Sequence, residues 1–179
     1  MPKAFNVLIL VLTAAGPATN GSATQEPEAT ARVRVFNQVG DTVRFHHNKS
    51  CYDKASMRGL ISKGFQASNG WSRLRENKTV GMPVAVDTPE KFNEYVVPAN
   101  EPITIEGMHI VSGYTGQGSY TGSCGPIGRY FTPQVGADYE AYITSDKTHC
   151  GLEIRQLLTE QGPVTTRSVH VVPAFPCRR

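Results

Sequence analysis

Residues 31–46 read ARVRVFNQVGDTVRFH and decide the fold of this chain, because apolar and polar side chains alternate in two short runs. Val33 and Val35 lie on one side of the first run, and Val43 and Phe45 lie on one side of the second. A period of two is typical of a β-strand with one buried face. The turn residues 37–41 between the runs include Gly40, so this stretch predicts a β-hairpin.

The same alternation recurs along the rest of the chain. It predicts further strands at residues 92–97, 103–106, 109–111, 127–132, 139–143, 150–158 and 164–172. Most are spaced by about ten residues with turns between them. The 17 glycines and 12 prolines also suit a chain with many turns. We therefore expect one all-β domain at residues 31–179, an antiparallel β-sandwich of seven to eight strands.

Residues 51–74 break this pattern, because their apolar side chains are loosely spaced and glycines interrupt them. We expect an irregular insertion with one helical turn within residues 54–61. Long connections on a compact β domain are often functional. The insertion and the glycine-rich residues 112–125 are therefore the two predicted binding loops, with Trp71, Tyr114 and Tyr120 as their contact residues.

The first 23 residues have the order of a secretory signal peptide. Lys3 precedes an apolar run at residues 4–15, and small residues follow at positions 21–23. The apolar run is too short to span a bilayer. Residues 24–30 are polar and predict a flexible leader. We expect a periplasmic or secreted protein with no transmembrane segment after cleavage.

Four cysteines in an exported chain predict two disulfides. Of the three possible connectivities we favour Cys124–Cys150, which ties the strand before Phe131 to a later strand. Cys51–Cys177 is then the second pair and holds the C-terminus to the end of the first predicted hairpin.

Gly122-Ser123-Cys124-Gly125 is similar to the nucleophile loop of chymotrypsin-like cysteine proteases, and His46 precedes it in the order that such enzymes use. A cysteine in a disulfide is not a nucleophile, so we expect no catalysis. The five histidines show no metal-binding spacing, and we expect no metal or other cofactor. The formal charge is +3 without a basic block, which argues against nucleic acid as a partner.

Residues 131–141, FTPQVGADYEA, form a strand ending in Phe-Thr-Pro, a glycine turn and a tyrosine that opens the next strand. This stretch resembles a hairpin of small uncharacterised exported bacterial β-sandwich proteins, including transthyretin-like and PEGA-like modules. Residues 77–83, NKTVGMP, resemble a segment of similar periplasmic or secreted proteins. The resemblance implies a fold and a bacterial exported setting, and it brings no catalytic residues.

These observations predict a non-enzymatic protein of the cell envelope that binds through its loops. Its partner would be another envelope or secreted protein. Two alternatives stay open: a periplasmic inhibitor or immunity protein, and a secreted cysteine hydrolase that uses Cys124 and His46.

Overall fold

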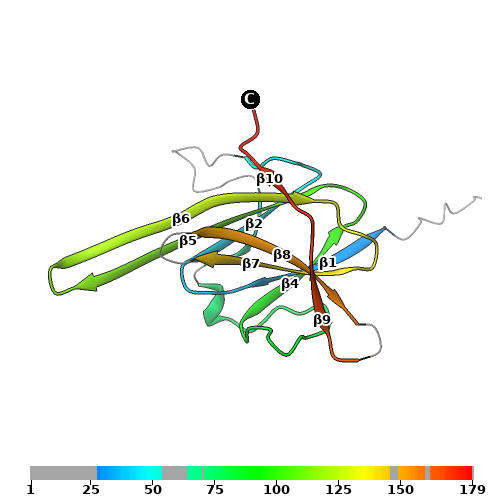
Figure 1. Ribbon diagram of the computed structural model, residues 1–179, viewed down its shortest axis with the longest axis horizontal. Coiled ribbons are helices and arrows are strands. Elements are labelled where there is room, and N and C mark those ends of the chain that lie inside the picture. Colours follow the sequence, from blue (N-terminus) through cyan, green and yellow to red (C-terminus); the bar gives the residue numbers. More distant parts are fainter. Residues whose placement is uncertain (1–27, 54–63, 70, 146–148, 160–161, 179) are drawn as a thin grey trace, which may run out of the picture.

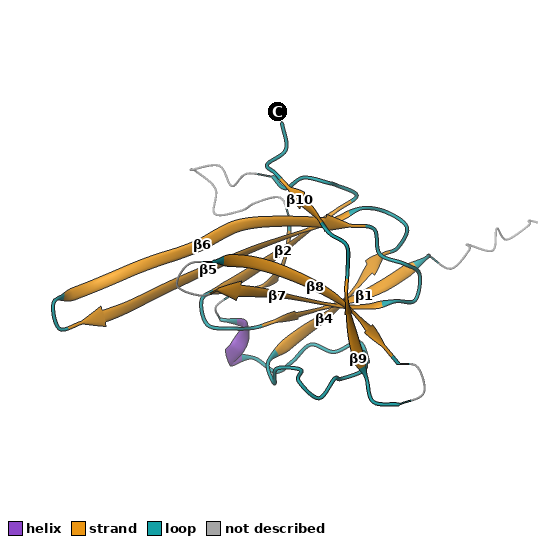
Figure 2. Ribbon diagram, viewed as in Figure 1, coloured by secondary structure: helices purple, strands orange, loops and turns teal. Residues whose placement is uncertain are grey.

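The computed structural model describes residues 28–53, 64–69, 71–145, 149–159 and 162–178. These residues form two five-stranded β-sheets packed face to face, one 3-10 turn, η1 (Ser72–Leu74), and no α-helix (Figures 1 and 2). The expected all-β class and two-sheet arrangement are confirmed. The number of strands is larger than expected, since ten strands are present in the described part of the chain.

We call the two sheets A and B. Sheet A has the order β4 (Phe92–Pro98), β1 (Thr30–Phe36), β7 (Asp138–Ser145), β8 (Cys150–Leu158), β9 (Thr165–Ser168). Sheet B has the order β10 (Val172–Ala174), β6 (Gly118–Phe131), β5 (Ile103–Thr115), β2 (Asp41–His47), β3 (Phe65–Ser68). Sheet B is antiparallel, whereas sheet A is mixed because β1 pairs with β7 in parallel. The prediction of a wholly antiparallel sandwich was therefore wrong for sheet A.

Two predicted hairpins are instead crossings from one sheet to the other. β1 lies in sheet A and β2 in sheet B, and the connection between β6 and β7 crosses back in the same way. Facing sheets lie about 10 Å apart, a distance that a few residues at about 3.3 Å each can span. Alternation identifies the buried side of each strand but not the strand beside it. For this reason a crossing and a hairpin look alike in the sequence.

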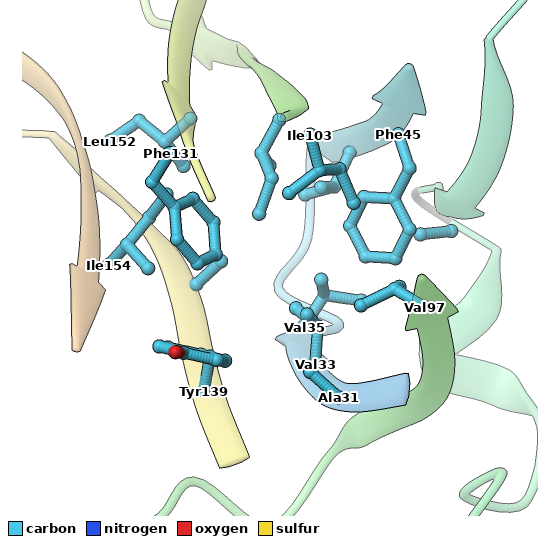
Figure 3. Close-up of a cluster of buried hydrophobic side chains, with 14 of the residues drawn as sticks. Ala31, Val33, Val35, Phe45, Val97, Ile103, Phe131, Tyr139, Leu152 and Ile154 are labelled. Atoms are coloured by element: carbon cyan, nitrogen blue, oxygen red, sulfur yellow. The ribbon is translucent and has the colours of Figure 1, made fainter. Parts of the chain in front are cut away.

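The core lies between the inner faces of the two sheets (Figure 3). Val33 and Val35 of β1 are fully enclosed there, opposite Phe45 of β2. Phe131 and Tyr139 meet edge to face with ring centroids 5.0 Å apart, so they pack against each other across the β6–β7 connection. The side chains that alternation assigns to the inside of β1 and β2 are the ones that fill this core.

Two disulfides tie the fold together. Cys51 pairs with Cys177, 126 positions away, and Cys124 pairs with Cys150. These are the two pairs that the sequence analysis favours. The Cys124–Cys150 bond joins β6 of sheet B to the first residue of β8 in sheet A, with the two Cα atoms 5.6 Å apart.

The predicted insertion at residues 51–74 is only partly described. It contains β3, which the sequence analysis missed, and η1. The helical turn expected within residues 54–61, the signal peptide at residues 1–23 and most of the leader lie outside the described residues. No helix in the described residues is long and apolar enough to cross a membrane.

A row of alternating charges crosses the outer face of sheet A. The register places Glu94 of β4, Arg34 of β1, Glu140 of β7 and Arg155 of β8 side by side. Arg34 lies 2.6 Å from Glu94 and 2.7 Å from Glu140, and Arg155 lies 3.0 Å from the second oxygen of Glu140. The Arg34 residue has 0% of its surface exposed. Each buried charge therefore has an opposite charge on a neighbouring strand.

The loop between η1 and β4 covers this row and is bonded to it. Glu94 Oε2 accepts hydrogen bonds from the backbone N–H groups of Val80 (2.7 Å) and Met82 (3.2 Å). Arg34 Nη2 donates to the carbonyl oxygen of Pro83 at 2.9 Å. Burial alone would raise the pKa of Glu94, but the hydrogen bonds from Arg34, Val80 and Met82 outweigh it and hold that pKa below its ordinary value.

Replacing Arg34 with methionine should leave Glu94 and Glu140 buried without their shared cation. We expect Arg34→Met to lower the free energy of unfolding by about 3–5 kcal/mol. Arg32→Met is the matched control, because Arg32 pairs with Asp138 in a partly exposed position on the same strand. That variant should lose about 1 kcal/mol or less. Urea unfolding measures both, and equal losses would contradict a central role for the buried row.

Glu94 also predicts a pH dependence of stability. Because its pKa is lowered in the folded protein, the folded state binds fewer protons at this site than the unfolded state. Its contribution is fully present above the ordinary value of 4.5 and is lost as the pH falls through the lowered value. Glu94→Gln should therefore be less stable than the parent at pH 7, with a difference that shrinks below pH 4.5. Glu101→Gln, which removes an exposed carboxyl group, is the matched control in the same series of urea unfolding measurements.

Candidate functional site

The longest strands of the molecule, β5 and β6, form a hairpin that extends beyond the two sheets (Figure 1). β5 pairs with β2 only as far as His109, and β6 pairs with β10 only at residues 128–130. Residues 110–123, which we call the arm, pair as strands only with each other in the described part of the chain. Within the described residues, no strand pairs with its outer backbone edges beyond Ile110.

The arm is an ordered hairpin rather than the glycine-rich loop predicted at residues 112–125. A two-residue turn, Gly116 and Gln117, joins the strands, and the Thr115 hydroxyl donates to the carbonyl oxygen of Gly118 at 3.0 Å. Gly113 is the register partner of Tyr120, and a Cβ at Gly113 would lie 2.5 Å from the Tyr120 hydroxyl oxygen. Glycine leaves room there for the cross-strand tyrosine ring. Gly113 therefore meets a steric requirement of the strand pairing.

The surface of the arm is uncharged and partly apolar. No Asp, Glu, Lys or Arg occurs from residue 110 to residue 128. Tyr114 is 83% exposed and Tyr120 is 52% exposed, and Ile110 and Val111 are also exposed. Cross-strand partners share a face, so one face carries Tyr114 with Ile110 and the other carries Tyr120 with Val111. The arm therefore presents a tyrosine and an aliphatic side chain on both faces.

Three contacts fix the arm at its base. The Cys124–Cys150 disulfide joins it to sheet A. His109 Nδ1 lies 2.7 Å from the carboxylate of Asp41, and the Ile110 N–H donates to the Gly40 carbonyl oxygen at 2.9 Å. Burial raises the pKa of Asp41, although the hydrogen bond to His109 acts in the opposite direction. An isolated two-stranded hairpin is only marginally stable, so these contacts hold the arm in a defined position.

The residues of the hydrolase alternative are not brought together. His46 lies on the outer face of sheet B, buried, with Nε2 2.9 Å from Glu106. Cys124 lies on the inner face, opposite His109 in the register, and its sulfur is bonded to Cys150. A disulfide sulfur has no thiolate to act as a nucleophile.

The other predicted residues are placed as follows. Trp71 is exposed at 74% but precedes η1, outside the arm. Tyr114 and Tyr120 lie together on the arm, although on opposite faces. Among the described residues, no three His, Cys, Asp or Glu side chains gather as a metal site.

The sequence analysis missed a buried polar cluster around His46. Tyr52 packs beside the His46 ring, with centroids 6.3 Å apart, and burial together with Glu106 raises the pKa of its hydroxyl. The backbone of Tyr52 is bonded to Phe175 and Cys177, next to the Cys51–Cys177 disulfide. This cluster is enclosed by the C-terminal segment, so it stabilises the outer face of sheet B and does not form an open site.

Two surface depressions lie outside the arm. One of about 420 Å³ is lined by Asn37, Gln38, Val39, Pro89, Glu90 and Lys91. Another of about 390 Å³ follows β8 and β9 past Tyr142, Glu153 and Arg155. In the second depression the Tyr142 hydroxyl donates to Glu153 at 2.6 Å, and burial together with this carboxylate raises the pKa of Tyr142 to about 12, so the hydroxyl stays protonated. The arm is therefore the strongest candidate for a functional surface in the described structure.

No family model, curated protein or solved structure matches this chain. The candidate site therefore depends on its own geometry. One feature of the sequence marks the arm: no charged residue occurs from residue 110 to residue 128, although the chain has 18 basic and 15 acidic residues.

Gly40 tests how the base of the arm is held. It has a φ of +87°, and a Cβ there would overlap the carbonyl oxygen of Ile110. Gly136 is a matched control, because its φ is +73° but its Cβ would meet nothing within 4 Å. Both Gly→Ala variants strain the backbone, but Gly40→Ala also pushes β5 away. We expect it to cost about 1–3 kcal/mol more than Gly136→Ala.

Urea unfolding gives the two free energies, and hydrogen exchange reports on the arm. Gly40→Ala should speed exchange at the arm amides, whereas Gly136→Ala should leave it unchanged. Equal stability losses and unchanged exchange would show that Gly40 does not position β5.

Proposed function

We propose that this protein is an exported, non-enzymatic binding protein whose arm contacts another envelope or secreted protein. The observation that carries the proposal is the uncharged, projecting ribbon with its two exposed tyrosines. The projection adds little to the core, because residues 110–123 are absent from the buried clusters of the described structure. Its exposed apolar surface is stabilised when a partner covers it.

The side chains of the arm suit protein recognition. Tyrosine gives a large contact area and keeps a hydroxyl for hydrogen bonding, and it is enriched in the residues that dominate binding energy. The disulfide at Cys124, the His109–Asp41 pair and the hydrogen bond to Gly40 limit the motion of the arm before binding. A contact element that is already ordered loses less conformational entropy on association.

Because the arm carries no charge, we expect it to bind an uncharged surface of the partner. A charged partner would have to give up its hydration without gaining an ion pair from the arm. The complementary surface is therefore uncharged, with apolar or hydroxyl-bearing side chains that fit Tyr114 and Tyr120.

The exported setting is supported by the disulfides. Bonds such as Cys51–Cys177 and Cys124–Cys150 persist in oxidising compartments and are rare in the cytosol. The signal-like residues 1–23 point to the same compartment.

A periplasmic inhibitor or immunity protein is the second candidate, and the shape of the arm favours it specifically. A narrow two-stranded projection can enter the cleft of an enzyme, as a broad sheet face cannot (Figure 2). The hydrolase alternative receives no support from the arrangement of Cys124 and His46 on opposite faces of sheet B.

Site-specific cross-linking in the producing cell tests the proposal. A photoreactive residue placed at Tyr114 or Tyr120 should form one discrete adduct with a different protein of the envelope or medium. The same probe at Val86, which is 97% exposed but lies outside the arm, is the matched control. It should give no such adduct, because exposure alone does not create a binding site.

The identified partner can then be titrated against purified variants. Tyr114→Ser and Tyr120→Ser should each weaken binding by about 10-fold or more, since buried tyrosine anchors typically contribute more than 1 kcal/mol. Val86→Ser should bind like the parent. Adducts at Val86 but not on the arm, or no adducts at any position, would contradict the proposal. Loss of the partner enzyme's activity on binding would identify the inhibitor role.

A further inference from the structure

We infer that the outer edge of β6 in the arm pairs with the same edge of a second copy of this chain. The pair would be antiparallel and two-fold symmetric, centred on Thr121. The inference rests on the proposed role of the arm as a binding element and assigns one of its two edges. The β5 edge and the two faces that carry Tyr114 and Tyr120 are left for the partner protein.

The direction of the backbone groups follows from one bond at the base of the arm. The Ile110 N–H donates to Gly40, toward β2 and away from β6. In an antiparallel pair, residues alternate between facing the partner strand and facing away from it. Ser123, which is opposite Ile110, therefore directs its N–H and C=O outward from β6, as do Thr121 and Ser119. These three residues form an unpaired hydrogen-bonding edge.

The sequence of this edge is self-complementary in size. With Thr121 opposite its own copy, Ser119 lies opposite Ser123, and Tyr120 lies opposite Gly122. The hydroxyl residues share one face, where Ser and Thr pairs are favourable across strands. On the other face each Tyr120 ring lies over Gly113 of its own arm, away from the β6 edge, so Gly122 of the second copy finds no bulky side chain in its way. The antiparallel register forms about six backbone hydrogen bonds.

Charge also fits a second copy. Identical edges repel each other when they carry charge, and natural proteins protect exposed edges with charged residues, proline or short strands. The β6 edge has none of these from residue 118 to residue 125. The other outer strands in the described structure are protected: β9 carries Arg167, β10 has three residues including Pro173, β3 has four residues, and β4 is bridged by Lys78.

The geometry allows two whole molecules to meet. From Thr121 to Cys124, where the disulfide joins β6 to sheet A, the strand runs roughly 10 Å at about 3.4 Å per residue. The two bodies would therefore lie at opposite ends of a four-stranded ribbon, about 20 Å apart along it. The outer edge of β5 has fewer unpaired backbone groups than that of β6, because the Ile110 N–H already donates to Gly40. We therefore expect pairing through β6 to stop at a dimer.

Charge variants test the register. Sedimentation of the purified, oxidised protein should show a concentration-dependent dimer. Ser119→Lys combined with Ser123→Lys should weaken dimerisation by at least about 10-fold, because like charges then lie opposite each other. Ser119→Glu combined with Ser123→Glu should do the same, and a mixture of the two proteins should restore the dimer. Ser112→Lys, on the β5 edge, is the matched control and should stay dimeric.

A cysteine at the two-fold axis gives a second measurement. Thr121→Cys should form an intermolecular disulfide, because directly opposite hydrogen-bonded residues have Cα atoms about 5.5 Å apart, within the range that a disulfide requires. Ser112→Cys should not. A parent that stays monomeric at all concentrations, or a dimer lost in Ser112→Lys but kept in both double variants, would overturn the inference.

The two proposals fail separately. Cross-linking from Tyr114 to a different protein without dimerisation would leave the proposed function standing and refute the β6 pairing. Cross-links only to a second copy would support the pairing and refute the role in binding another protein.

Discussion

The structure of sheet A depends on the burial of Arg34 between two carboxylates. A guanidinium without a counter-charge in this position would lose its hydration with no compensation. Glu94 and Glu140 provide that compensation from the strands on either side of β1. Since one of these strands is antiparallel to β1 and the other parallel, the mixed pairing is what brings both carboxylates level with Arg34. The charge row therefore favours this strand order over others that would bury the same apolar side chains.

The row also explains how a loop without regular structure stays on the outer face of the sheet. Glu94 uses one oxygen for Arg34 and the other for the N–H groups of Val80 and Met82. The loop thus satisfies hydrogen-bonding capacity that the sheet would otherwise leave unmatched, and the described residues contain no buried side-chain polar atom without a partner. A sheet fixed on both faces in this way gives the disulfide at Cys150 a firm attachment point. The arm is held through that disulfide.

The sequence supports the strands and their buried sides, but not their partners. Val33, Val35 and Phe45 are where alternation places them, and the two disulfides are the favoured pairs. The crossing between β1 and β2 was read as a hairpin because local alternation carries no information about which strand lies alongside. The parallel β1–β7 pair brings Glu140 beside Arg34, although the two residues are 106 positions apart in the sequence. In the arm, residues 112–125 were predicted as a glycine-rich loop, because the tyrosine that requires Gly113 becomes its neighbour only through the register.

The outer strands of the body and those of the arm differ in how well they are protected against association. The body protects its outer strands by means that reduce association, such as Pro173 in β10 and Arg167 in β9. The arm keeps two open edges and exposed tyrosines without a single charge, although a lysine at Ser119 or Thr121 would be sterically acceptable on an outward strand position. An unprotected ribbon carries a risk of nonspecific association, and it contributes little to the core. These exposed features are what support the proposed binding role, and the contacts at Cys124, His109 and Gly40 hold the ribbon in one orientation.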